Sequence, residues 1–367
     1  MISRSACVII LASVSLLTGC GGSDGAAPSA AVSTSTTTGV TDSYLVPNLS
    51  SLSPSSLLIN SGFFSPENFG VSLKIAATQG YATDGTHNFL FSTQTIVQTD
   101  SQWNVLYTNS APFSGIDITL THVGDGEVSG GKIYAPLACN TQEKCSPEAV
   151  AIGVYSANTA GLPLERWADI TSSGCDGSGI AVGPNNTLYV SSFFVNPDVL
   201  CLYDATTLES KGTLTLSTPI PRIQGISFDP ASQRFAVSAD NAARTIGYIY
   251  FVSLDGEVVG PAYTVPQTGE LEGLDFTQGY IGYVIQPFDY VYFLYPIQLT
   301  GSHFYSASKV EVDDAAQQTT YESGELLDAI VPASSLHRFG QVQVTVLNPS
   351  PGGGTSSALP FTVTPSE

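Results

Sequence analysis

The chain has 367 residues, 31 of them acidic and 11 basic, and it carries a net charge of −20. Such a charge repels the phosphates of nucleic acids and anionic lipid head groups, which argues against a nucleic-acid partner and favours divalent cations or neutral ligands. Charged residues make up only 11% of the chain, glycine and proline are abundant, and no long segment carries apolar residues at helical spacing. We therefore expect an all-β protein with many turns.

Residues 1–19 have the pattern of a secretory signal, because Arg4 is followed by a short apolar stretch from Cys7 to Leu17. The run from Leu17 to Cys20 (Leu-Thr-Gly-Cys) resembles the bacterial lipoprotein signal. The resemblance implies cleavage before Cys20, lipidation of its thiol and anchoring of the mature chain in the cell envelope. The residue after it, Gly21, is not the aspartate that retains such proteins at the inner membrane, so the outer membrane is favoured and its face stays open. The alternative is an ordinary secretory signal with a chance cysteine.

Residues 20–43 form a Gly/Ser/Thr/Ala-rich tract, which we interpret as a flexible tether. Four cysteines follow it, Cys139, Cys145, Cys175 and Cys201. An even number in an exported chain indicates two disulfides, for which three connectivities exist. We favour Cys139–Cys145, which closes a small loop, and Cys175–Cys201, which would link two strands. A zinc site is a weaker alternative, because the chain has no C-x₂-C pair and its four histidines are scattered.

Residues 66–295 contain an internal repeat in which a small or polar residue and a glycine precede a short alternating apolar run. The five copies are Gln79–Thr83, Ser114–Ile118, Ser178–Val182, Gln224–Phe228 and Glu272–Phe276. Further strands follow most copies, and four strands repeated every 40–50 residues or so is the period of propeller blades. We predict a β-propeller of about five blades, with six blades or a pair of β-sandwiches as alternatives. The segment resembles lactonase-like or quinoprotein-like bacterial propellers, a resemblance of architecture that names no substrate.

The C-terminal run from residue 296 to 367 alternates apolar and polar residues between Asn-Pro and Pro-Gly-Gly-Gly turns. Its motifs, among them Ile297–Phe304, Ala329–Leu336 and Val342–Pro349, resemble the IPT/TIG immunoglobulin-like domain. The strand that opens such domains is matched far upstream, at Pro47–Ser56, so we predict that residues 44–65 hold the first strand and that the propeller is inserted after it.

The insertion makes a prediction about the last blade. Tyr290–Tyr295 would be its third strand, and Val71–Thr78 would supply its fourth strand from the N-terminal side of the repeat. The ring would then be closed by two segments far apart in the sequence.

Candidate site residues fall into two groups, and no specific catalytic motif is present. His122, Asp125 and Glu127 follow the second inner strand and are candidates for proton transfer or for binding a divalent cation, although a polar turn, with Gly124 and Gly126 at positive φ, is the simpler explanation. The residues before the repeat glycines, Gln79, Ser114, Ser178, Gln224 and Glu272, should meet at one mouth of the central channel. Glu270 points to the same side of its strand as Glu272.

Two functions are consistent with this pattern. The first is a lipid-anchored module that binds a protein or glycan ligand through the propeller. The second is a calcium-dependent hydrolase or lyase, with Asp125, Glu127 and Glu272 as metal ligands at the channel. A structural role in an envelope complex is a third, weaker possibility. His122, Asp125, Gln224 and Glu272 must lie close together for the enzyme hypothesis to hold.

Overall fold

The fold is described from a computed structural model for residues 44–54, 56–60, 70–72, 78–139, 148–266, 269–277, 279–286, 290–332, 335–336 and 340–366. These residues belong to one compact unit, Asp42–Glu367. Nearly all of its regular structure is β-strand, as the composition predicts, and a short 3₁₀ helix, η3, covers Thr171–Ser173. The helices among the described residues are too short to cross a membrane.

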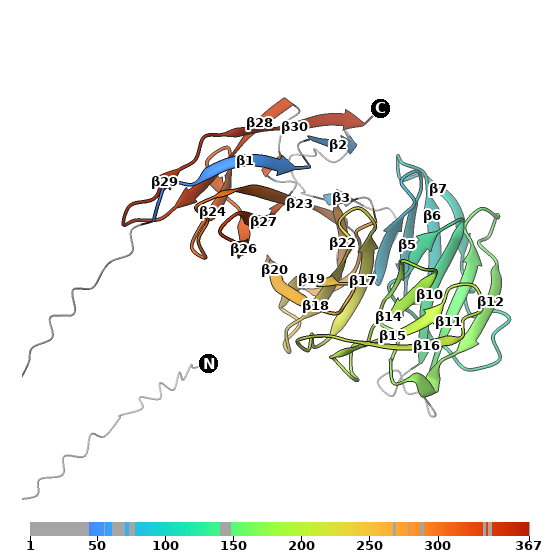
Figure 1. Cartoon of the computed structure of the whole chain (residues 1–367). Helices are drawn as coiled ribbons and strands as arrows, with labels where there is room; N and C mark the ends of the chain where they lie inside the picture. The colour runs from blue at the N-terminus through green and yellow to red at the C-terminus, as the bar shows by residue number, and fades with distance from the viewer. Residues whose placement is uncertain are drawn as a thin grey trace, which may run out of the picture. The chain divides into compact units, whose positions relative to one another are not determined.

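Five antiparallel sheets follow one another along the chain (Figure 1). The first sheet contains β4 (Gly80–Thr83), β5 (Asn88–Ser92), β6 (Thr95–Thr99) and β7 (Val105–Asn109). The second contains β8 (His122–Val123), β9 (Glu127–Ser129), β10 (Lys132–Cys139), β11 (Ala149–Ser156) and β12 (Leu164–Asp169). The third contains β13 (Ile180–Gly183), β14 (Thr187–Val190), β15 (Val199–Asp204) and β16 (Ser210–Thr215). The fourth contains β17 (Ile223–Asp229), β18 (Arg234–Asp240), β19 (Ile246–Ser253) and β20 (Val258–Pro266). The fifth begins with β21 (Glu270–Asp275), β22 (Ile281–Gln286) and β23 (Tyr290–Ser302).

The first strands of these sheets form a closed ring. Strand β4 contacts β9, β9 contacts β13, β13 contacts β17, β17 contacts β21, and β21 returns to β4. Apolar side chains fill the space between adjacent sheets; for example, the rings of Tyr189 in the third sheet and Phe235 in the fourth lie 4.6 Å apart. A ring of sheets that bury their faces against one another is a β-propeller, so the predicted fold is confirmed with five blades.

One of the five predicted copies of the repeat, Ser114–Ile118, is not an inner strand. Ser114 and Gly115 lie in a turn, and Ile116 and Ile118 pack against the core of the second blade from outside its strands. The inner edge of that blade runs instead through β8 and β9, where Asp125 bridges to Gly179 of the third blade. The alternating pattern after Gly115 reflects a loop that is buried on one side, and it does not indicate a strand in a sheet. In the second blade, the residue that faces the centre of the ring is Asp125.

The fifth blade is closed from the N-terminal side. Strand β3 (Gly70–Ser72) pairs with Tyr290–Tyr292 of β23, which is the role that the sequence predicted for Val71–Thr78. Residues 73–77 of that prediction lie outside the described part of the chain. Strand β23 does not stop at Tyr295, where the third strand of the blade was expected to end, but continues to Ser302.

The second half of β23 lies outside the propeller and pairs with strands from the two ends of the chain. It pairs with β27 (Leu326–Pro332) and β1 (Asn48–Ser53), and β26 (Gln318–Ser323) pairs with β27. A separate sheet contains β2 (Ser56–Asn60), β30 (Leu359–Ser366), β28 (Gly340–Asn348), β29 (Gly354–Thr355), β24 (Lys309–Val312) and β25 (Ala315–Ala316). The N-terminal strands therefore pair with C-terminal ones, and the proposed membership in the IPT/TIG class stays a prediction.

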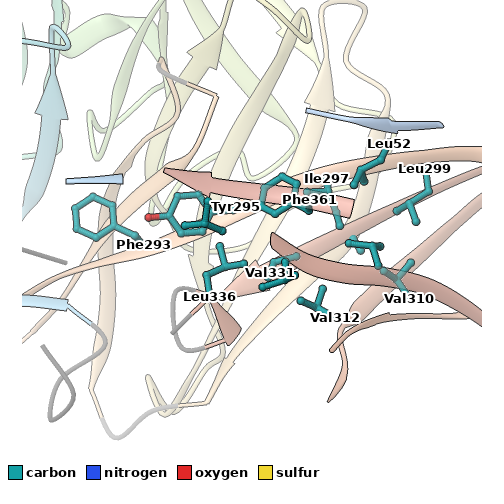
Figure 2. Packing of buried hydrophobic residues seen from close by; sticks show 14 of the residues in the cluster. Leu52, Phe293, Tyr295, Ile297, Leu299, Val310, Val312, Val331, Leu336 and Phe361 are labelled. Carbon is teal, nitrogen blue, oxygen red and sulfur yellow. The ribbon is translucent and has the colours of Figure 1, made fainter. Parts of the chain in front are cut away.

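One apolar cluster joins these layers to the propeller. Figure 2 shows Ile297 of β23 with Leu52 of β1, Val331 of β27 and Phe361 of β30 in this cluster. The same cluster extends to Phe293, which lies in the propeller half of β23. Because the core and the strand are both continuous, the boundary predicted between residues 295 and 296 falls within a strand.

Candidate ligand-binding site at the channel mouth

The centre of the ring is filled by the side chain of Asp125. A methyl group added at Gly273 would lie 2.0 Å from Asp125 Oδ1, and one added at Gly225 would lie 2.4 Å from its Oδ2. Gly80 faces the same carboxyl group. These three glycines are therefore required, because the first, fourth and fifth blades leave the space that the aspartate of the second blade occupies.

Asp125 is 1% exposed, and burial raises the pKa of its carboxyl group well above the ordinary value. The Leu274 N–H donates a hydrogen bond to Oδ2 at 3.1 Å, whereas Oδ1 has no partner among the described residues. Asp125 thus lies at the centre of the glycine ring and does not line the pocket at the channel mouth, where the sequence predicted it.

Two further carboxyl groups, those of Glu127 and Asp275, form a buried pair deeper in the channel. The Glu127 carboxyl group accepts a hydrogen bond from Ser227 Oγ at 2.7 Å, and Asp275 Oδ2 accepts one from the Thr83 N–H at 3.0 Å. Burial raises the pKa of Glu127 well above its ordinary value and that of Asp275 to about 6, and the two carboxyl groups are hydrogen-bonded to each other. Two adjacent carboxyl groups share a proton when no cation is present.

On the other side of the glycine ring lies a pocket of about 300 Å³. Its lining includes Gln79, His122, Gln224, Glu270 and Glu272, which are five of the six residues predicted for the mouth; the sixth is Asp125. Ser178 lines the pocket as well, whereas Ser114 is an exposed turn residue. The residues before the repeat glycines converge because each inner strand starts at this end of the ring.

An ion pair and an amide organise one wall of the pocket. Arg244 Nη1 lies 2.9 Å from Glu270 Oε2, and Gln224 Nε2 donates to Glu270 Oε1 at 2.6 Å. The Arg244 guanidinium also lies over the ring of Phe193, 5.2 Å from its centroid. The charge of Glu270 is therefore balanced within the protein.

Two other carboxyl groups nearby, those of Glu272 and Asp240, form no ion pair among the described residues. Glu272 is 4% exposed, and burial together with the charges of Glu270 and Asp240 raises its pKa well above the ordinary value. Asp240 accepts a hydrogen bond from the Leu271 N–H at 3.1 Å through Oδ1, but its Oδ2 is buried without a partner among the described residues. Burial raises the pKa of Asp240 to about 7.

The neighbouring rim carries residues that sequence reasoning missed. Asp176 accepts hydrogen bonds from the Phe193 N–H at 2.8 Å and the Phe194 N–H at 2.6 Å. The Phe194 side chain is 48% exposed at the edge of the pocket. Asp176 follows Cys175, whose predicted disulfide with Cys201 is confirmed. Cys145 lies outside the described residues, so the Cys139–Cys145 pairing stays a prediction.

The calcium ligands predicted from the sequence are spread along the channel. Glu272 lines the pocket, Asp125 fills the ring, and Glu127 contacts Ser227 on the far side of it. No group of three or more His, Cys, Asp or Glu side chains is arranged to hold a metal ion in the part of the chain that the structure describes. The geometry therefore gives no support to calcium at these three residues.

No family model and no curated protein matches this chain. Among solved structures it is similar to a putative oxidoreductase (glucose dehydrogenase) from Thermus thermophilus, at 14% identity and a TM-score of 0.42, over 75% of this chain and 92% of that one. It is also similar to hydrazine synthase of Kuenenia stuttgartiensis, at 13% identity and a TM-score of 0.38, over 76% and 78%. A putative gluconolactonase matches at 14% identity and a TM-score of 0.38, over 59% and 70%. At such low scores these proteins imply nothing about the ligand or activity of this chain.

Proposed function

We propose that this protein is a binding module that holds a small polar organic molecule in the channel-mouth pocket. The observation that supports it is the convergence of Gln79, Ser178, Gln224 and Glu272, from four different blades, on one pocket. A concave site with a few convergent polar groups is the usual form of a ligand site, and about 300 Å³ is at the lower end of the usual volumes.

The charge of the pocket narrows the class of ligand. Asp176, Glu270 and Glu272 line it, and Arg244, which also lines it, pairs with Glu270. An anionic molecule would meet repulsion from these groups and from the net charge of −20. A neutral molecule with hydroxyl or amide groups, such as a sugar unit of a glycan, or a cation fits better.

The proposal is tested by titrating the protein with a panel of monosaccharides, amino acids and amines, with calorimetry as the readout. We expect Gln224→Ala and Glu272→Gln to weaken binding of any ligand found by about tenfold, since each removes a polar or charged group that lines the pocket. Gln102→Ala and Glu257→Gln, at exposed positions outside the pocket, are the matched controls. A ligand that binds all four variants alike would show that the pocket is not its site.

A second candidate function is hydrolysis or lyase chemistry, favoured by the raised pKa of Glu272 beside Asp240. A carboxyl group that keeps its proton near neutral pH can act as a general acid, and a neighbouring carboxylate can act as the base. The same panel, followed by NMR over hours with and without EGTA, separates the functions, because turnover consumes a compound that a binding module only holds.

We also propose that the chain is anchored in the bacterial envelope, with the outer membrane favoured, through lipid on Cys20, which lies outside the described residues. In cells fed a radiolabelled or clickable fatty acid, the wild-type chain should be labelled and fractionate with membranes. Cys20→Ala should be unlabelled, and Cys7→Ala is the control because that cysteine leaves with the signal. Label retained in Cys20→Ala would contradict the anchor.

A further inference from the structure

We infer that the ligand of the channel-mouth pocket is a saturated ring with hydroxyl groups at its edge, and that one face of this ring stacks on Phe194. Asp176 is the positioning residue that holds Phe194 in place. The inference rests on the proposed function, because it names the class of molecule that the pocket holds. It goes beyond that proposal by assigning the residue that selects the ligand.

Phe194 is an exposed aromatic residue in a lining that is otherwise rich in polar side chains. It is 48% exposed, and it lines the pocket together with Gln79, Gln224 and Glu272. Phe193 lines the pocket as well, but only 9% of it is exposed. Exposed apolar surface at the edge of a concave site is typical of a position that a ligand covers. Phe194 therefore offers a bound molecule the apolar surface that the polar side chains do not.

The backbone that carries Phe194 is fixed to the neighbouring segment of the third blade. Asp176 accepts hydrogen bonds from the Phe193 N–H at 2.8 Å and from the Phe194 N–H at 2.6 Å. The residue before Asp176 is Cys175, and its disulfide with Cys201 joins this segment to β15, the strand that follows the loop. The acceptor and the loop that donates to it are thus covalently linked.

The rings and the far end of the loop are held as well. The ring centroids of Phe193 and Phe194 lie 4.5 Å apart at an interplanar angle of 77°, and the Arg244 guanidinium lies 5.2 Å from the centroid of Phe193. Asn196 Nδ2 donates a hydrogen bond to the Gly174 carbonyl at 2.6 Å. A side chain that is positioned before the ligand arrives loses little conformational freedom on binding, which favours affinity.

The polar part of the lining requires a ligand with several hydroxyl groups. The lining combines carboxylates, which only accept hydrogen bonds, with amides such as those of Gln79 and Gln286, which also donate. A hydroxyl group both donates and accepts, so it can pair with either kind of side chain. An aromatic ligand would also stack on Phe194 but brings few such groups. A volume of about 300 Å³ suits one ring rather than a chain of rings.

Matched ring and open-chain compounds test the inference. Myo-inositol and D-glucitol have the same number of carbon atoms and hydroxyl groups, but D-glucitol has no ring; methyl β-D-glucopyranoside is a second ring compound, and catechol is an aromatic one. Each is titrated by calorimetry against the full-length protein. An open chain also loses more conformational freedom on binding, so the readout is how each variant changes the ratio of the ring and open-chain affinities.

We expect Phe194→Ala to weaken binding of both saturated ring compounds by about tenfold and to leave that of D-glucitol nearly unchanged, because only a ring presents a flat apolar face. Phe194→Tyr should retain the ratio of the wild-type protein. Val195→Ala is the matched control, since Val195 is the next residue of the same loop and is 43% exposed but does not line the pocket.

Stacking and positioning each have a separate readout. Protons that lie over the face of an aromatic ring resonate upfield, so the C–H protons of the bound ring compounds should shift upfield with the wild-type protein and Phe194→Tyr but not with Phe194→Ala. Asp176→Asn should weaken binding of the ring compounds in the wild-type background and have no further effect in the Phe194→Ala background. An equal effect in both backgrounds would contradict a role of Asp176 through Phe194.

The outcomes separate the inference from the proposal beneath it. If Gln224→Ala weakens binding of the ring compounds but Phe194→Ala does not, the pocket is a ligand site and the stacking assignment is wrong. If catechol binds tighter than both saturated rings, the class of ligand is wrong. If no compound in either panel responds to any pocket variant, the proposed function falls and the inference falls with it. Should Asp176→Asn fail to fold, the variants of the exposed Phe194 decide alone.

Discussion

At the scale of single residues, the centre of the propeller depends on one side chain and three glycines. Asp125 occupies the space that Gly80, Gly225 and Gly273 leave open, so the identity of each of these residues depends on the others. The repeated glycines predict that the backbones of the inner strands lie close together near the axis. They do not predict that the second blade has an aspartate, Asp125, at the corresponding place. That substitution breaks the sequence pattern at the very blade where the repeat was misplaced.

We expect Gly273→Ala to destabilise the protein by about 1–3 kcal/mol, because its methyl group would overlap the Asp125 carboxyl group. The measurement is urea unfolding. Gly324→Ala is the control, since a methyl group there would meet nothing closer than 3.8 Å. Combining Gly273→Ala with Asp125→Gly should cost less than the sum of the two single changes; simple additivity would show that the overlap is not the cause.

The site residues show how far sequence can reach. Gln79, Gln224 and Glu272 were predicted because a residue next to an inner-strand glycine must start at the channel mouth, and Glu270 followed from strand alternation. Asp176, Phe193 and Arg244 were missed because turns between strands place them, and the pairing of turns from different blades carries no short-range signal. Their one local clue was the position of Asp176, two residues before the predicted mouth residue Ser178.

At the scale of elements, β23 and β3 determine how the molecule is closed. Strand β23 pairs with β22 and β3 in the propeller and with β27 and β1 beyond it. The sequence predicted a closing strand near residue 71, because the last repeat is one strand short. It did not predict the continuity of β23, since Pro296 suggests an end to a strand and only the partner Ile330 shows that pairing runs through it.

Replacing both Val71 and Ser72 by proline should open the ring. Consecutive N–H groups of a strand point to opposite sides, so one of the two prolines must remove a donor that faces β23. We expect the melting temperature to fall by several degrees and the amides of Tyr290–Tyr292 to exchange faster. Val46→Pro, at an exposed residue of the same N-terminal segment, should leave both unchanged. Normal amide protection in the double proline variant would contradict closure by β3.

At the scale of the whole molecule, the protein buries acid groups along the axis rather than only at its surface. Asp125, Glu127, Asp275, Asp240 and Glu272 all have raised pKa values, with burial as the main cause in each case. The folded chain therefore keeps protons that the unfolded chain releases. Below the ordinary pKa of 3.8 for aspartate both states are protonated, and the stabilising contribution is complete. It is lost as the pH rises through the folded values of about 6 and 7.

Melting temperature should consequently be higher at pH 5 than at pH 8. For Asp275, a shift of about two pKa units corresponds to roughly 3 kcal/mol in total, of which about 1.4 kcal/mol is lost between pH 5 and pH 8. Glu127→Gln should flatten the profile, because the amide can keep the hydrogen bond to Asp275 without titrating. Glu257→Gln removes an exposed charge and should leave the slope as it is. Equal slopes in both variants would assign the effect to surface repulsion instead.

The Asp125 side chain also determines how a ligand enters and leaves the pocket. With Asp125 blocking the axis, the hollow is a blind end, and a molecule cannot enter through one face of the propeller and leave through the other. A ligand therefore enters and leaves through the same opening, which Phe194 borders. A bulkier residue at that opening would slow both rates together, so residence time would lengthen while the equilibrium occupancy stayed the same.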